Sequence, residues 1–115
     1  MNINKFTIKS QEALQQAQQL AQANENQHIE NEHLFKGILE VDENVTPFIL
    51  KKLNVNVELF KKILDSTIQS FPKVSGGDIM LSREAGTTVN EAEIIAKKMN
   101  DEFVSIEHLL LAIFK

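Results

Sequence analysis

The sequence IENEHLFKGIL at residues 29–39 recurs, with substitutions, as VSIEHLLLAIF at residues 104–114. The two stretches align at an offset of 75 residues, which places Glu32-His33-Leu34 on Glu107-His108-Leu109. A repeated helical hairpin explains this match, because two copies stacked about a pseudo-twofold axis can bury each other's apolar stripe. The same offset, without a gap, aligns the earlier pairs Thr7 and Ser82, Leu14 and Val89, Ala17 and Ala92, and Ala21 and Ala96.

Helical spacing of apolar residues extends through most of the chain, and helix-capping residues mark where the helices begin. No segment of any length alternates with period two, so the sequence predicts no sheet. The expected fold is all-α, with two pseudo-twofold-related helical repeats at about 6–71 and 81–115, a linker at 72–80, and a truncated second repeat. The predicted helices are 7–23, 31–40, 46–53, 57–71, 82–99 and 106–114. All but the second have a predicted N-cap residue, and these caps are Thr7, Thr46, Asn56, Ser82 and Ser105 in chain order.

The composition excludes several classes of protein. The chain has 12 basic and 16 acidic residues and a net charge of −4, which argues against a nucleic-acid partner. No apolar run approaches the ~20 residues of a spanning helix, so no membrane partner is expected. The absence of cysteine removes any thiolate nucleophile and suits a reducing cytoplasm.

The chemistry-bearing residues do not form a catalytic or metal-binding motif. No G-x-x-x-x-G-K-[ST] or G-x-S-x-G pattern occurs, so we expect no enzyme and no cofactor in this chain. His33 and His108 each follow a glutamate, and adjacent helical residues point in different directions, so no metal site is expected. Both histidines are predicted to be buried and hydrogen-bonded to backbone.

The last predicted helix is apolar on every side, which is typical of a helix that is buried all round. Repeat one continues for two further helices after its equivalent helix, whereas repeat two stops at Lys115. We therefore expect that the sequence is part of a longer chain, or that another subunit covers helix 106–114.

Three stretches together resemble the Clp N-terminal repeat domain that precedes the ATPase rings of AAA+ unfoldases. They are NKFTIKSQEALQQAQQLA at 4–21, VDENVTPFILKKLNVNVELFKKILD at 41–65 and FPKVSGG at 71–77. The resemblance covers essentially the whole chain and is greatest to the disaggregase branch of the family, although the family domain has more helices than this chain. It implies recruitment of unfolded or aggregated polypeptide, AAA+ domains in the same hexameric parent that use ATP and Mg²⁺, and a possible co-chaperone system.

An unfolded substrate needs a shallow apolar groove with polar groups at its rim, and we expect this groove between the two repeats, where the first and sixth helices begin. The resemblance implies a polar cluster there of Thr7, Asp101 and Glu107. We add Ile8, Phe103 and Leu110 as its apolar lining. Each residue also has an ordinary structural role that competes with this interpretation. Thr7 can simply cap a helix, Asp101 is common in turns, Glu107 complements a helix dipole, and Phe103 can belong to the core.

Two alternative functions remain open from the sequence. The first is recognition of an adaptor or of a phosphoarginine mark, as in another branch of the family. There, acidic positions that correspond to Glu32 and Glu107 help to bind phosphoarginine-tagged substrates, and a carboxylate can pair bidentately with a guanidinium group. The second alternative is a purely structural module that assembles through helix 106–114.

Overall fold

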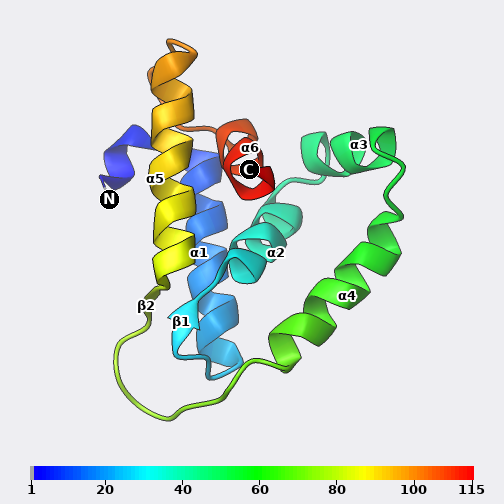
Figure 1. The fold of residues 1–115 in the computed structure, drawn as a ribbon, viewed down its shortest axis with the longest axis vertical. Helices are drawn as coiled ribbons and strands as arrows, with labels where there is room; N and C mark the ends of the chain where they lie inside the picture. The colour runs from blue at the N-terminus through cyan, green and yellow to red at the C-terminus, as the bar shows by residue number, and fades with distance from the viewer. Residues whose placement is uncertain (1) are drawn as a thin grey trace.

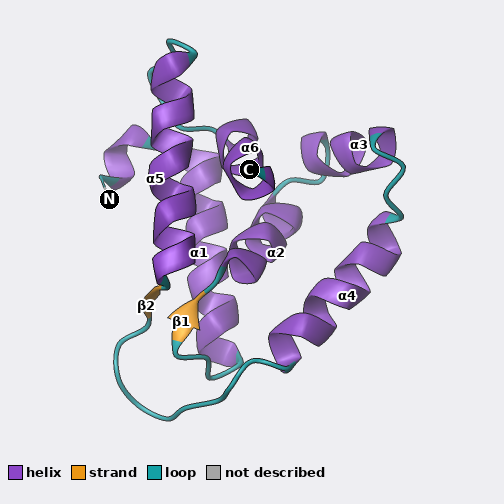
Figure 2. Cartoon of the chain, in the orientation of Figure 1, coloured by secondary structure: helices purple, strands orange, loops and turns teal. Residues whose placement is uncertain are grey.

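A computed structural model describes residues 2–115, and it consists of helices joined by turns and by a longer loop at residues 70–79, with two very short strands (Figures 1 and 2). The elements are η1 (Ile3–Lys5), α1 (Ile8–Ala23), β1 (His28–Ile29), α2 (Asn31–Val41), α3 (Val45–Lys52), α4 (Val57–Gln69), β2 (Met80–Leu81), α5 (Arg83–Lys98) and α6 (Ile106–Phe114). The predicted all-α class is confirmed. None of these helices is long and apolar enough to cross a membrane.

Three of the predicted caps begin their helices as expected. The side chains of Thr7, Asn56 and Ser82 accept hydrogen bonds from the backbone N–H three residues later, at 3.1, 3.1 and 3.0 Å. Each bond satisfies one of the N–H groups that the first helical turn leaves without a partner. The starts of α1, α4 and α5 therefore follow directly from the sequence.

The α1–α2 hairpin packs more closely than side chains of ordinary size would allow. Ala13, Ala17 and Ala21 present a fully buried stripe on α1. On α2, Gly37 faces this stripe, and a Cβ atom at that position would lie 2.5 Å from the carbonyl oxygen of Ala13. A glycine is therefore needed for the close approach of the two backbones.

Two short parallel pairings join the repeats, and we call them together the seam. Ile29 pairs with Leu81 in the β1–β2 sheet, and Phe6 pairs with Val104 in an isolated bridge. The 75-residue offset turns each pairing into the other, as a pseudo-twofold axis requires. The prediction of no sheet is wrong at this scale, because strands of two residues are too short to show alternation.

The start of α3 also differs from the prediction. Thr46 is not the cap, because it already lies within α3. Its side chain is buried, and its Oγ1 donates to Asp42 at 2.7 Å. The carboxylate of Asp42 also accepts from the backbone N–H of Asn44, Val45 and Thr46, at 3.1, 3.1 and 2.9 Å. Asp42, which precedes α3, therefore satisfies the free backbone N–H groups at the start of this helix.

Helices α3 and α4 form an arm that extends from the end of α2 and returns beside it (Figure 1). The ring of Phe60 on α4 meets that of Phe35 on α2 edge-on, with centroids 4.9 Å apart. Phe114, near the end of α6, lies on the same Phe35 ring at 5.7 Å. The sixth helix is not buried all round, because Leu111 and Phe114 are about half exposed.

Candidate functional site

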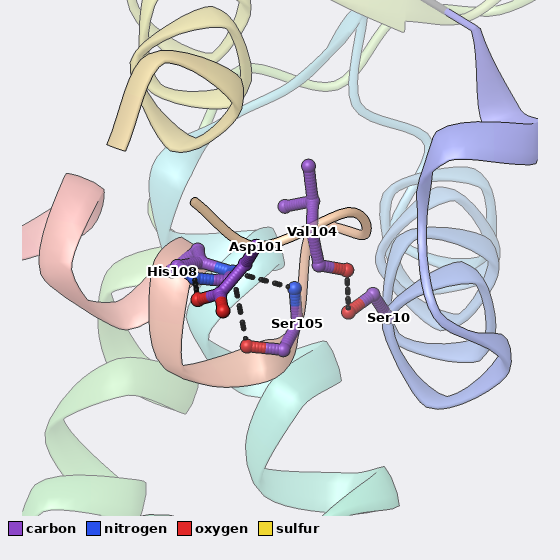
Figure 3. Close-up of polar contacts among 5 residues, drawn as sticks. All are labelled: Ser10, Asp101, Val104, Ser105 and His108. Atoms are coloured by element: carbon purple, nitrogen blue, oxygen red, sulfur yellow. Dashed lines mark hydrogen bonds and ion pairs between the residues drawn. The ribbon is translucent and has the colours of Figure 1, made fainter. Parts of the chain in front are cut away.

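The predicted site lies where the start of α1 meets the turn between α5 and α6. The backbone N–H of Thr7 donates to the Val104 carbonyl at 2.9 Å, and the Val104 N–H donates to the Lys5 carbonyl at 2.8 Å. The hydroxyl of Ser10, which is fully buried on α1, donates to the same Val104 carbonyl at 2.9 Å (Figure 3). Residues almost a hundred positions apart are therefore fixed beside each other.

Ser10 was not predicted, although the repeat contains a signal for it. The equivalent position in repeat two is Ala85, which is also fully buried but has no hydroxyl to donate. The two pairings of the seam therefore differ, since only the one at Phe6 and Val104 carries this additional side-chain bond. A serine in one copy and an alanine in the other marks the asymmetric position.

Two of the three predicted apolar residues lie on the surface. Ile8, in the first turn of α1, is 75% exposed, and Phe103, in the α5–α6 turn, is 45% exposed. Phe103 therefore does not belong to the core. The prediction for Leu110 is wrong as a surface contact, because this side chain is only 3% exposed and belongs to the core. The sequence of α6 is apolar on all sides, so spacing alone could not show which residues face inward.

The polar residues Thr7 and Glu107 occupy first turns of helices. Thr7 is half-buried, and its Oγ1 lies 2.8 Å from the Ser10 hydroxyl in addition to capping α1. Glu107 is exposed in the first turn of α6, and Glu32 holds the equivalent place on α2. A carboxylate at either position complements the positive end of the helix dipole.

Asp101 is held in place by a buried histidine. Its Oδ2 lies 2.8 Å from Nε2 of His108, whose Nδ1 accepts from the backbone N–H of Ser105 at 2.8 Å (Figure 3). Because Nδ1 is an acceptor, the ring proton resides on Nε2 and is donated to the carboxylate. This arrangement ties the α5–α6 turn, and with it Phe103, to the first turn of α6.

The equivalent histidine of repeat one accepts the same kind of backbone hydrogen bond but has a neutral partner, and it lacks the 3.0 Å contact that Nδ1 of His108 makes with the Ser105 hydroxyl. Nδ1 of His33 accepts from the Glu30 backbone N–H at 2.8 Å, and Nε2 lies 2.9 Å from Oδ1 of Asn26. Burial lowers the pKa of His33, and the nearby Glu30 carboxylate offsets part of this effect. The prediction that both histidines are buried and bonded to backbone is confirmed.

The structure thus brings Thr7 and Ile8 to one side of the seam and Asp101, Phe103 and Glu107 to the other. We call these five residues the seam surface. A cavity of about 380 Å³ beside it is lined in part by Lys5, Ile94, Asp101 and Val104. Within residues 2–115, no group of three or more His, Cys, Asp or Glu residues could hold a metal ion. The arrangement places the exposed apolar side chains of Ile8 and Phe103 among polar groups.

Comparison with protein families assigns most of the chain. The family model of the Clp repeat (R) N-terminal domain matches residues 5–115. The chaperone protein ClpB of Bacteroides thetaiotaomicron is 50% identical over 113 residues, which cover 98% of this chain. The ClpB of Porphyromonas gingivalis is 43% identical over 113 residues, again with 98% of this chain covered. The chain spans about 13% of the length of each of these two relatives.

Solved structures show the same fold at lower identity. The crystal structure of the Hsp104 N-terminal domain from Candida albicans matches with a TM-score of 0.88 at 20% identity, and the match covers 96% of this chain and 74% of that one. A complex of a ClpV N-domain with a VipB peptide matches with a TM-score of 0.77 at 19% identity. That match covers 96% of this chain and 68% of the ClpV chain.

Proposed function

This chain belongs to the Clp repeat (R) N-terminal domain family, and on that premise we propose that it recruits unfolded or aggregated polypeptide for a disaggregase of the ClpB type. The observation that carries the proposal is the 50% identity to a ClpB chaperone across 98% of the chain. The solved complex of a ClpV N-domain with a peptide supports peptide binding by this fold. The chain itself contributes recognition and no catalysis.

The other activities belong to the parent protein in this proposal. ATP and Mg²⁺ are bound by AAA+ domains of the same polypeptide, which assemble as a hexamer in the cytoplasm and act with a co-chaperone system. Family membership supports this arrangement. This chain contains no G-x-x-x-x-G-K-[ST] motif for binding phosphates, so the proposal assigns ATP binding to the other domains.

The seam surface is the proposed place of capture. Ile8 and Phe103 provide apolar contact for side chains that an unfolded polypeptide exposes. Thr7 directly precedes Ile8, and Asp101 and Glu107 lie on either side of Phe103 along the chain. In the proposal their oxygens accept hydrogen bonds from unpaired backbone N–H groups of the substrate. A surface of so few exposed apolar groups binds weakly and with little sequence preference, which suits transfer of many substrates.

Nuclear magnetic resonance with a permanently unfolded, reduced and alkylated protein tests the proposal. Chemical shifts should change around Thr7, Phe103 and Glu107, and the Phe103→Ser variant should weaken binding about fivefold. The matched control is Leu53→Ser, which removes a similarly exposed side chain from the α3–α4 arm. Equal binding by both variants, or shifts confined to the arm, would refute capture at the seam surface.

A second candidate is recognition of phosphoarginine. It rests on the placement of Glu32 and Glu107 at the same position of α2 and α6, where neither carboxylate forms an ion pair with any described residue. Titration with free phosphoarginine separates the two functions. Saturable shifts centred on both glutamates, without a response to the unfolded protein, would favour the phosphoarginine function.

A further inference from the structure

A second surface lies away from the seam, in a groove between α2, α4 and the end of α6. The groove has a volume of about 230 Å³. Phe35 forms its floor, and Phe60 and Ile63 of α4 and Ile113 of α6 form its walls. We call it the aromatic groove. Its apolar lining and its size fit one large side chain of a ligand rather than an extended stretch.

One polar side-chain atom beside the groove has no hydrogen-bond partner. Asn31 lines the groove, and its Oδ1 is buried without a hydrogen-bond partner among residues 2–115. It is the one such side-chain atom in the described part of the chain. A buried acceptor without a donor is unfavourable, and rotation of the half-buried Asn31 side chain would let an N–H group of a ligand satisfy it. A peptide backbone supplies such a donor at every residue except proline.

The charge at the rim of the groove defines the ligand further. Glu32 lies at the rim, and no cation of the described chain pairs with it. The nearest lysine along α2, Lys36, is already paired with Asp65 of α4. An ammonium group on a ligand therefore meets an uncompensated carboxylate, whereas an acidic ligand would be repelled.

We propose that the aromatic groove binds short extended peptide segments in which a large apolar side chain follows a lysine. The apolar side chain packs against Phe60 and Ile63, a backbone N–H donates to Oδ1 of Asn31, and the lysine ammonium pairs with Glu32. The groove shares no residue with the seam surface. This second binding site therefore goes beyond capture at the seam surface, and the two sites can be tested separately.

The test uses the tripeptide acetyl-Lys-Phe-Leu-amide and methyl-labelled protein. Its addition should shift the methyl signals of Ile63 and Ile113 and leave that of Ile8 unchanged. The partner peptide acetyl-Glu-Phe-Leu-amide should bind about fivefold more weakly, and this difference should shrink at high salt. Equal binding of the two peptides, or shifts centred on Ile8, would overturn the proposal.

Two residues of α4 provide a matched pair of variants. Ile63 and Leu59 are both 54% exposed, but only Ile63 lines the groove. Ile63→Asp should weaken tripeptide binding about tenfold, and Leu59→Asp should change it less than about twofold. Ile63→Ser repeats the measurement with a smaller perturbation. Equal loss in the two Asp variants would contradict the proposed site.

Asn31→Ala separates recognition from folding. The substitution removes the buried oxygen that has no partner, so the melting temperature should not fall, whereas tripeptide binding should weaken about threefold. A lower melting temperature with unchanged binding would show that Asn31 has only a structural role and would overturn its part in recognition. Phe103→Ser, which removes a seam contact, should leave tripeptide binding unchanged and so keeps this test separate from that of the proposed function.

Discussion

At the scale of single residues, the two histidine networks differ in the charge of the group that faces Nε2. Nε2 of His33 faces the neutral amide of Asn26, and Nε2 of His108 faces the carboxylate of Asp101. In both, Nδ1 accepts from the backbone N–H of the residue that caps the next helix. A second proton on the His33 ring would break its bond to Glu30, so the first turn of α2 depends on a neutral His33.

His33 should make the stability of the protein depend on pH. Its pKa in the folded protein lies below the ordinary value of 6.5, because burial disfavours the charged ring. The unfolded chain therefore binds a proton that the folded chain does not, and the free energy of unfolding falls as the pH drops from about 6.5 toward the folded pKa. Urea unfolding at about pH 7.5 and about pH 5.5 measures this loss.

The control for this prediction is the exposed His28. His33→Gln should flatten the difference between the two pH values, and His28→Gln should leave it as in the parent chain. A difference that persists in full after His33→Gln would assign the pH dependence to other groups.

At the scale of elements, the two helical glycines have opposite roles. A Cβ at Gly37 would meet the Ala13 carbonyl at 2.5 Å, whereas one at Gly86 on α5 would have no neighbour within 4 Å. Gly37→Ala should therefore cost about 2–3 kcal/mol by forcing α1 and α2 apart. Gly86→Ala should raise the free energy of unfolding by about 0.5–1 kcal/mol, because alanine has the higher helix propensity. Chemical denaturation of the two variants checks both signs, and a tolerated Gly37→Ala would refute the close packing.

The same elements show how far the sequence could predict the structure. Capping residues located the starts of α1, α4, α5 and α6, because a cap acts within three residues of its own position. The start of α3 was missed because Asp42 reaches it from before the helix. Leu110 was misplaced because α6 has no polar face to orient it. The pairings of the seam could not be predicted from local patterns, because they join positions such as Phe6 and Val104 that are distant in sequence.

At the scale of the whole molecule, the seam couples the two repeats. Ser10 donates from repeat one to Val104 of repeat two, so its loss should destabilise both. Ser10→Ala should cost about 1 kcal/mol without a clash, since the equivalent Ala85 is also fully buried. Amide hydrogen exchange should show an equal loss of protection in α1 and α5. A loss confined to α1 would mean that the repeats unfold separately.

The family assignment and the all-α class were predicted from the whole sequence and are confirmed. The division at 6–71, 72–80 and 81–115 stays a prediction, and β2 already begins within the predicted linker. The residues of the seam surface likewise stay a prediction, with Ile8 and Phe103 exposed as capture requires.

The segment between α4 and β2 contains Gly76 and Gly77, both at positive φ and with no atom within 4 Å of a hypothetical Cβ. This segment carries little of the packing that unites the repeats, because the seam pairs strands from opposite sides of it. Cutting the chain between the two glycines should therefore yield fragments that remain associated. The gene could equally be split there, and the two halves, produced as separate polypeptides, would complement each other to rebuild the domain.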